Sequence, residues 1–282
     1  MGEAGPGALN TLVATDELAR HPEWRVFDCR HDLVKPDLGE QQYLASHIPG
    51  AAFAHLDKNL SAPKSGTNGR HPLPDPQAFI AWLGRQGLKS TDQIVAYDGG
   101  PGAMAARLWW MLRWVGHDRV AVLDGGYAKW VKEGRAVTAE LPVFPATAYP
   151  GRVRAELAVD VAYVQEHLEE ISLVDGRAPA RWRGESEPID PVAGRIPGSL
   201  NRFSNDNLTA EGTFKRPEVL KHEFLTVLGT RKLSAIVQSC GSGVAACHNL
   251  LAMEVAGLKG ARLYAGSWSE WIADPKRPRE SG

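Results

Sequence analysis

The chain has 282 residues and a formal net charge of −1, from 32 Lys and Arg against 33 Asp and Glu. Hydrophobic residues make up 43% and charged residues 23%, close to the averages of globular proteins, which excludes collagen-like, disordered and membrane-embedded classes. The length suits two domains, and the absence of a long Lys/Arg run gives no electrostatic footprint for nucleic acid or anionic lipid. We therefore expect a small-molecule substrate and neither a nucleic-acid nor a membrane partner.

The N-terminus and the cysteines indicate the compartment. The first ten residues, MGEAGPGALN, have neither a basic nor an apolar signal region, and no stretch of about 18 apolar residues occurs in the chain. The three cysteines, Cys29, Cys240 and Cys247, form no CxxC pair, so neither a disulfide framework nor a zinc site is indicated. We expect reduced thiols, no bound metal and a cytoplasmic location.

In chain order, the first half alternates strand and helix patterns. The apolar run IVAYD at 94–98 predicts a strand, the glycines after it a tight turn, and the periodicity of AARLWWMLRWVG at 105–116 a helix. The Pro-rich stretch LPVFPATAYPG at 141–151 then predicts an extended connector. Strand, turn and helix is therefore the expected unit.

The second half repeats the first. WRVFDCR at 24–30 matches ISLVDGR at 171–177, and HIPGAAF at 47–53 matches RIPGSLN at 195–201. The remaining matches, each 141 residues apart, pair Gly116 with Gly257, Gly125 with Gly266 and Trp130 with Trp271. Several matches in one order indicate a duplication.

The duplication predicts the domain organisation. We expect an N-terminal domain at 1–140, a linker at 141–151 and a C-terminal domain at 152–282. Repeated strand and helix units favour an α/β fold in which each domain is a parallel sheet flanked by helices on both faces. Functional residues are then expected at the carboxyl ends of the strands.

Cys240 is the candidate nucleophile. It ends the predicted strand AIVQSC at 235–240 and precedes a glycine turn and a helix, where backbone N–H groups lower the pKa of a thiol. Gly241 and Gly243 can adopt backbone angles that let successive N–H groups converge on an anion. The alternative is a buried, inert cysteine, which is our interpretation of Cys29 and Cys247.

The repeat supplies an internal comparison for Cys240. Its counterpart in the first domain is Asp98, in VAYDGGPGAM. Because a carboxylate cannot act as a sulfur nucleophile, we expect activity only in the second domain.

These segments resemble a known family. The D-x-R strand ends, the I-P-G turns and the G-[GS]-x-x-x-W segments at 125–130 and 266–271 are similar to those of the two-domain rhodanese family, the thiosulfate and 3-mercaptopyruvate sulfurtransferases. The resemblance extends over nearly the whole chain. It implies two tandem rhodanese-like domains, the first inactive and the second carrying the cysteine.

The loop after Cys240 implies the sulfur donor. The sequence CGSGV is similar to that of 3-mercaptopyruvate sulfurtransferases, whereas thiosulfate enzymes carry cationic residues there. The implied substrate-binding loop residues are Gly241, Gly243, Val244 and Ala245. Ala245 stands where the family usually has Thr, and thiosulfate remains the alternative donor.

The resemblance implies one arginine that binds the sulfur donor. Arg181, in PARWRGESEP, matches the first of two arginines that bind the donor anion, a role that suits the paired N–H groups of a guanidinium. The second arginine is lost around Ile189 and Asp190. Arg183 and Arg195 are nearby in sequence and are candidates to compensate.

The resemblance to mercaptopyruvate enzymes also implies an Asp, His and Ser arrangement. The matching positions are Asp57 in FAHLDKNL, His71 in GRHPLP and Ser242 in the loop. Such a triad would move a proton at the substrate. The alternative is local, with Ser242 bonding within its own turn and His71 in an ordinary loop.

The expected reaction is a two-step sulfur transfer. The Cys240 thiolate takes sulfur from the donor to form a persulfide, and a small thiol, a thioredoxin-like protein or cyanide then accepts it, with no metal or organic cofactor. A phosphatase on the same fold would need an arginine six positions after the cysteine, where this chain has Ala246. A non-catalytic sulfur-carrier or binding module is the other alternative, and the intact Cys240 argues against it.

Overall fold

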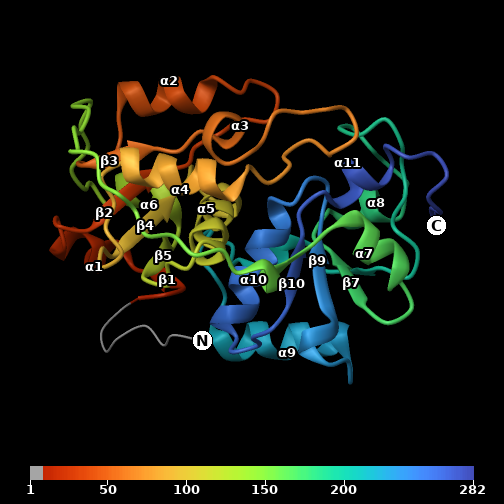
Figure 1. Cartoon of the computed structure of the whole chain (residues 1–282). Coiled ribbons are helices and arrows are strands. Elements are labelled where there is room, and N and C mark those ends of the chain that lie inside the picture. The colour runs from red at the N-terminus through yellow and green to blue at the C-terminus, as the bar shows by residue number, and fades with distance from the viewer. Residues whose placement is uncertain (1–8) are drawn as a thin grey trace. The chain divides into compact units, whose positions relative to one another are not determined.

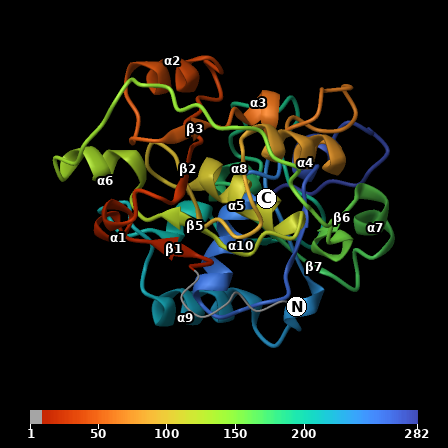
Figure 2. The same cartoon turned by 60° about the vertical axis from the view of Figure 1, so that its left-hand side comes forward.

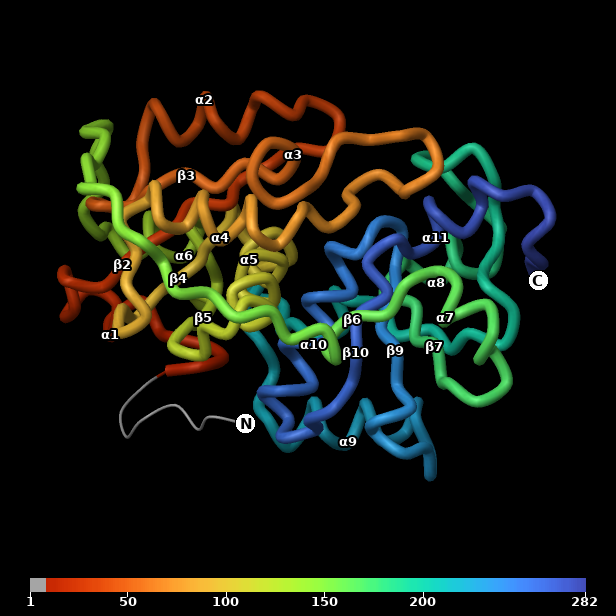
Figure 3. Tube along the Cα trace, in the orientation of Figure 1, coloured from red at the N-terminus to blue at the C-terminus, as the bar shows by residue number. Residues whose placement is uncertain are grey.

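A computed structural model describes residues 9–282. Residues 1–8, on which most of the expectation about a missing signal region depends, lie outside this description. The chain divides into two compact units, the first made of residues 1–62, 74–154 and 210–213, and the second of 63–73, 155–209 and 214–282. Figures 1 and 3 follow the chain by colour from the N- to the C-terminus.

The first unit contains one five-stranded parallel sheet in the order β1-β5-β4-β2-β3. Its strands are β1 (Leu12–Val13), β2 (Arg25–Asp28), β3 (Ala51–Phe53), β4 (Ile94–Tyr97) and β5 (Val120–Leu123). Its helices are α1 (Thr15–Arg20), α2 (Leu38–Ala45), α3 (Leu56–Asn59), α4 (Pro76–Arg85), α5 (Ala103–Trp114) and α6 (Gly126–Lys132).

The second unit contains a parallel sheet of the same design, in the order β6-β10-β9-β7-β8. Its strands are β6 (Ala158–Val159), β7 (Ser172–Asp175), β8 (Leu200–Asn201), β9 (Ile236–Ser239) and β10 (Arg262–Tyr264). Its helices are η1 (Ala155–Leu157), α7 (Val161–Glu166), α8 (Pro179–Trp182), η2 (Ser204–Asn207), α9 (Pro217–Leu228), η3 (Leu233–Ala235), α10 (Ala245–Val255) and α11 (Ser267–Trp271).

The central strands are short and buried along their whole length. All residues of β4, β5 and β9 are buried, which is typical of a parallel sheet covered on both faces. The helix that follows the central strand packs beside it in each unit, α5 against β4 and β5, and α10 against β9 and β10. Figures 1 and 2 both show α5 beside β5. The predicted α/β fold of two parallel sheets flanked by helices is confirmed.

Parallel strands bring their carboxyl ends to one edge of each sheet. In the second unit Asp175 of β7 pairs in register with Ser239 of β9, so the residues that follow these two strands are neighbours. Cys240 and the Asp175-to-Arg177 segment therefore meet at this edge. The functional site is expected there.

Two segments depart from a simple division of the chain. The Pro-rich segment 141–151 has neither helix nor strand and belongs to the first unit, where Thr147 N–H donates to Gly84 O and the Arg25 guanidinium lies over the Phe144 ring. The segment 63–73, between α3 and α4 in sequence, clusters with the second unit. This segment carries Arg70 and His71. Across residues 9–282, no helix has the length and apolar character needed to cross a membrane.

Candidate active site

Cys240 follows β9 directly and lies at the base of a glycine loop. Its Sγ accepts hydrogen bonds from the N–H groups of Ser242 and Gly243, at 3.4 Å and 3.1 Å, and the residue is only 3% exposed. Gly243 has a φ of +77°, a conformation that favours glycine. The loop therefore directs two N–H groups at one sulfur, which stabilises negative charge there.

The segment around α11 fixes the backbone of this loop. Trp268 N–H donates to Cys240 O at 3.0 Å, and Ser269 N–H donates to Gly241 O at 2.9 Å. Ser267 Oγ accepts from Cys240 N–H at 3.0 Å, although Ser267 itself has a φ of +53° that is unusual for a side-chain-bearing residue. The G-S-x-x-x-W segment thus positions the nucleophile through three backbone contacts.

The D-x-R strand end forms a buried ion pair next to Cys240. Arg177 donates from Nε and Nη2 to Asp175, and both side chains are about 1–3% exposed. Burial lowers the pKa of Arg177, but Asp175, Glu187 and Cys240 raise it by more, so the guanidinium stays charged. A fixed positive charge therefore lies close to Cys240.

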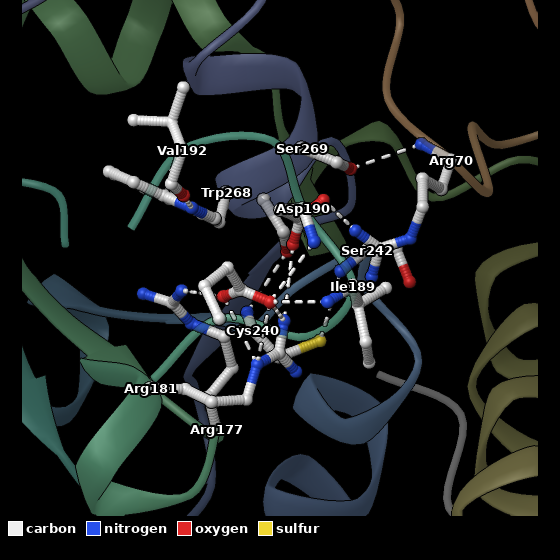
Figure 4. A network of polar contacts seen from close by, with 12 residues as sticks. Arg70, Arg177, Arg181, Ile189, Asp190, Val192, Cys240, Ser242, Trp268 and Ser269 are labelled. Atoms are coloured by element: carbon white, nitrogen blue, oxygen red, sulfur yellow. Dashed lines mark hydrogen bonds and ion pairs between the residues drawn. The ribbon is translucent and has the colours of Figure 1, made fainter. Parts of the chain in front are cut away.

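Arg181, the predicted donor-binding arginine, belongs to a second group of charges (Figure 4). It lies in α8 and donates to Glu187 from Nε and Nη2, while Nη2 also donates to Asp190 Oδ2 at 3.1 Å. Burial of Glu187 raises its pKa, but the hydrogen bonds from Arg181 and from two backbone N–H groups lower it by more. Glu187 is therefore a carboxylate that anchors Arg181.

Arg70 joins the same group, and the sequence analysis missed it. Its Nη1 donates to Asp190 Oδ1, and its backbone N–H donates to Ser269 Oγ at 3.0 Å. A Cβ placed on Gly241 would lie 2.8 Å from Arg70 Nη2 and 3.5 Å from Arg181 Nη2. Both guanidinium groups therefore flank the residue that follows Cys240. The only sequence signal was the position of Arg70 beside His71.

Arg183 and Arg195, the candidates to replace the second arginine, make their contacts elsewhere. Arg183 forms an exposed pair with Glu185, and Arg195 pairs with Glu280 and stacks over Trp182. The position where the second arginine was expected, Asp190, carries the opposite charge. Its carboxylate accepts from Arg70 and Arg181 instead.

Two of the three residues implied as a proton relay lie in contact. His71 Nδ1 and Ser242 Oγ are 2.8 Å apart, and both residues are buried. Asp57 belongs to the first unit, where its N–H donates to His55 Nδ1 and its Oδ2 lies 3.9 Å from His31 Nε2. The segment 63–73 brings His71 to the loop, although His71 and Ser242 are 171 positions apart in the sequence.

The group of histidines around Asp57 does not fit a cation site. His31, His55 and Asp57 offer ligand atoms within 4.8 Å of one another. His55 Nδ1 accepts the Asp57 N–H, so the neutral ring carries its proton on Nε2 and offers no spare lone pair to a metal. Burial lowers the pKa of His55, which favours this neutral form.

The other cysteines and Asp98 occupy different surroundings from Cys240. Cys29 follows β2 and is fully buried, and burial raises the pKa of its thiol, while Cys247 lies inside α10 and donates to Gly243 O. Asp98 takes the place of Cys240 at the end of β4, where its carboxylate accepts four backbone N–H groups between residues 100 and 105. Burial raises the pKa of Asp98, and these donors oppose that effect.

Comparisons with known proteins identify the family of the chain. The family model for the rhodanese-like domain matches residues 12–133 and 160–274. The chain is 48% identical over 278 residues to a probable 3-mercaptopyruvate sulfurtransferase of Pseudomonas aeruginosa, covering 96% of this chain and 98% of that one. It is 34% identical to human 3-mercaptopyruvate sulfurtransferase, over 84% of this chain and 81% of the human one.

Solved structures give the same assignment. The 3-mercaptopyruvate sulfurtransferase from Leishmania major matches with a TM-score of 0.87 at 32% identity, covering 98% of this chain and 77% of that one. SseA from Escherichia coli, described as a 3-mercaptopyruvate sulfotransferase, matches with a TM-score of 0.80 at 31% identity, covering 93% and 100%. The resemblance stated from the strand ends, turns and signature segments is confirmed. The chain belongs to the two-domain rhodanese family of sulfurtransferases.

Proposed function

We propose that this protein transfers sulfur from 3-mercaptopyruvate to a thiol or to cyanide through a persulfide on Cys240. The observation that carries the proposal is the Cys240 Sγ, which accepts two loop N–H groups at the end of β9 beside the Arg177 guanidinium. The chain from 240 to 246 carries no charged side chain, which suits a donor of low charge. The 48% identical relative bears the name of this activity.

The first step forms the persulfide. The Cys240 thiolate attacks the donor sulfur, the carbon–sulfur bond breaks, and its electron pair leaves on the pyruvate carbon as an enolate. The donor thiol gives up one proton and the enolate gains one, so the step balances with pyruvate as the product. Ser242 and His71, which share a hydrogen bond, are the proposed carriers of this proton, with Asp57 as the proposed third member.

The second step returns the enzyme to its starting state. An acceptor thiolate, from a small thiol or a thioredoxin-like protein, attacks the outer sulfur and releases the Cys240 thiolate. Turnover needs Cys240 reduced, and none of the three cysteines forms a disulfide. We therefore place the reaction in the reducing cytoplasm. Thiosulfate, with sulfite as the leaving group, is the alternative donor, because bovine thiosulfate sulfurtransferase is also 34% identical.

Persulfide trapping tests the proposal. The purified protein is mixed with one equivalent of mercaptopyruvate or thiosulfate, and the Cys240 peptide is analysed by mass spectrometry, with Cys240→Ser as the control. We expect one added sulfur from mercaptopyruvate, and a larger kcat/KM for mercaptopyruvate than for thiosulfate. No added sulfur from either donor would contradict a sulfurtransferase, and a larger kcat/KM for thiosulfate would reverse the choice of donor.

A further inference from the structure

Two guanidinium groups and one buried carboxylate beside the loop point to a specificity site. We propose that Arg70 and Arg181 together bind the carboxylate of the sulfur donor, and that Asp190, which holds both arginines, favours donors with a single negative charge. This inference rests on the proposed function of Cys240. It assigns roles to Arg70 and Asp190 that the sequence alone did not indicate.

Each arginine places one guanidinium nitrogen close to Gly241. Measured from the position that a Cβ on Gly241 would occupy, Arg70 Nη2 lies at 2.8 Å and Arg181 Nη1 at 3.7 Å. Within residues 9–282, neither of these two nitrogens donates a hydrogen bond to a protein acceptor. Both nitrogens therefore flank Gly241, and a donor carboxylate lying beside this residue could accept one N–H from each arginine.

The carboxylates of the group are buried behind the cations. The side chains of Asp190 and Glu187 are 2% and 3% exposed, whereas those of Arg70 and Arg181 are 24% and 16% exposed. An anion that arrives from solution therefore meets guanidinium N–H groups first. Figure 4 draws Arg70, Arg181 and Asp190 together with Cys240.

The charges of these arginines and carboxylates favour a donor with one negative charge over a donor with two. The group contains three arginines, at 70, 177 and 181, and three carboxylates, at 175, 187 and 190, whose charges balance one another. At neutral pH mercaptopyruvate carries one carboxylate charge, because an ordinary thiol is mostly protonated there, whereas thiosulfate carries two charges. The Asp190 carboxylate, which contacts both arginines, repels the second charge at short range.

The main test neutralises Asp190 without changing its shape. In Asp190→Asn we expect the ratio of kcat/KM for thiosulfate to kcat/KM for mercaptopyruvate to rise about tenfold, mainly through KM for thiosulfate. The matched control is Glu185→Gln, an exposed carboxylate on the same segment that pairs with Arg183, and it should leave the ratio unchanged. An unchanged ratio in Asp190→Asn would overturn the inference.

Removing Arg70 tests whether the two arginines act together. In Arg70→Ala we expect kcat/KM for mercaptopyruvate to fall about tenfold through KM, while the exposed Arg183→Ala changes it less than about twofold. In the Arg70→Ala background, Asp190→Asn should no longer shift the donor ratio. A full shift without Arg70 would contradict a shared site.

The outcomes separate this inference from the proposed function. Persulfide formation in the wild-type protein establishes the chemistry of Cys240, whatever the variants do. If Asp190→Asn fails to fold, as judged by its thermal unfolding, Arg70→Lys provides the test, because it keeps the charge but loses the second N–H arm. We expect a raised KM for mercaptopyruvate at unchanged kcat, and an unchanged KM would overturn the role of Arg70.

Discussion

Ser242 offers two separate groups to the proposed reaction, its side-chain hydroxyl and its backbone N–H. Its hydroxyl lies 2.8 Å from His71 Nδ1, and its N–H donates to Cys240 Sγ. In the proposed reaction the N–H stabilises the anionic sulfur of Cys240 with either donor. The hydroxyl contributes to the rate only where a proton must move. Pyruvate leaves as an enolate that needs a proton, whereas sulfite leaves as a stable anion.

This difference predicts a donor-dependent loss in Ser242→Ala. We expect kcat for mercaptopyruvate to fall about tenfold to a hundredfold, and kcat for thiosulfate to change less than about threefold. Steady-state kinetics with both donors measures the difference. His71→Asn should reproduce it, and the double variant should be no worse than either single one. Equal losses with both donors would remove Ser242 from the proton relay.

At the scale of elements, the loop between β9 and α10 depends on close backbone contact. The G-S-x-x-x-W segment bonds the backbone of Cys240 and Gly241, and Gly243 approaches the strand end of β10. The first unit uses the same device, because Tyr127 N–H donates to Asp98 O at 2.8 Å. The signature segment thus acts as a clamp on the central strand end in both units.

Gly243→Ala tests this contact. A Cβ at Gly243 would lie 2.3 Å from Ala265 O, and the φ of +77° is itself unfavourable for alanine. We expect a stability loss above about 2 kcal/mol and no persulfide on Cys240. Gly257→Ala is the matched control, with a φ of +75° and nothing within 4 Å of the new Cβ, and should cost only about 1 kcal/mol. Equal losses in urea unfolding of the two variants would contradict the steric argument.

At the scale of the whole molecule, one fold is used for two purposes. Both sheets have the same strand order, and both carry a loop of converging N–H groups after the central strand. In the second unit the loop holds the Cys240 sulfur, and in the first it is filled by the Asp98 carboxylate. We infer that the first unit has a structural role and no sulfur chemistry.

Asp98→Asn separates these roles. The amide keeps one acceptor oxygen but turns an NH₂ group toward backbone N–H donors, so we expect a loss of about 2 kcal/mol or more and a lowered unfolding temperature. Persulfide formation on Cys240 should be unchanged. Asp16→Asn, at an exposed ion pair on α1, should leave both the unfolding temperature and the persulfide unchanged. Loss of the persulfide in folded Asp98→Asn would contradict the division of roles.

The sequence by itself determined the fold class and the family, and it supplied Cys240 as the proposed nucleophile. Buried apolar runs, glycine turns and helical periodicity are local signals, and the duplication aligned Cys240 with Asp98 without any knowledge of tertiary contacts. Arg181 and the pair of His71 and Ser242 came from motif positions, and their catalytic roles stay predictions. Arg183 and Arg195 were plausible only because they are close in sequence.

Only the tertiary structure decided which charges surround the loop. Arg70 and Asp190 are 120 residues apart, and no periodicity or motif connects them. They meet because the segment 63–73 clusters with the second unit, away from the helices that flank it in sequence. The pairing of two arginines with one buried carboxylate depends on distance in space. Local sequence patterns indicate only which residues are neighbours along a strand, a turn or a helix.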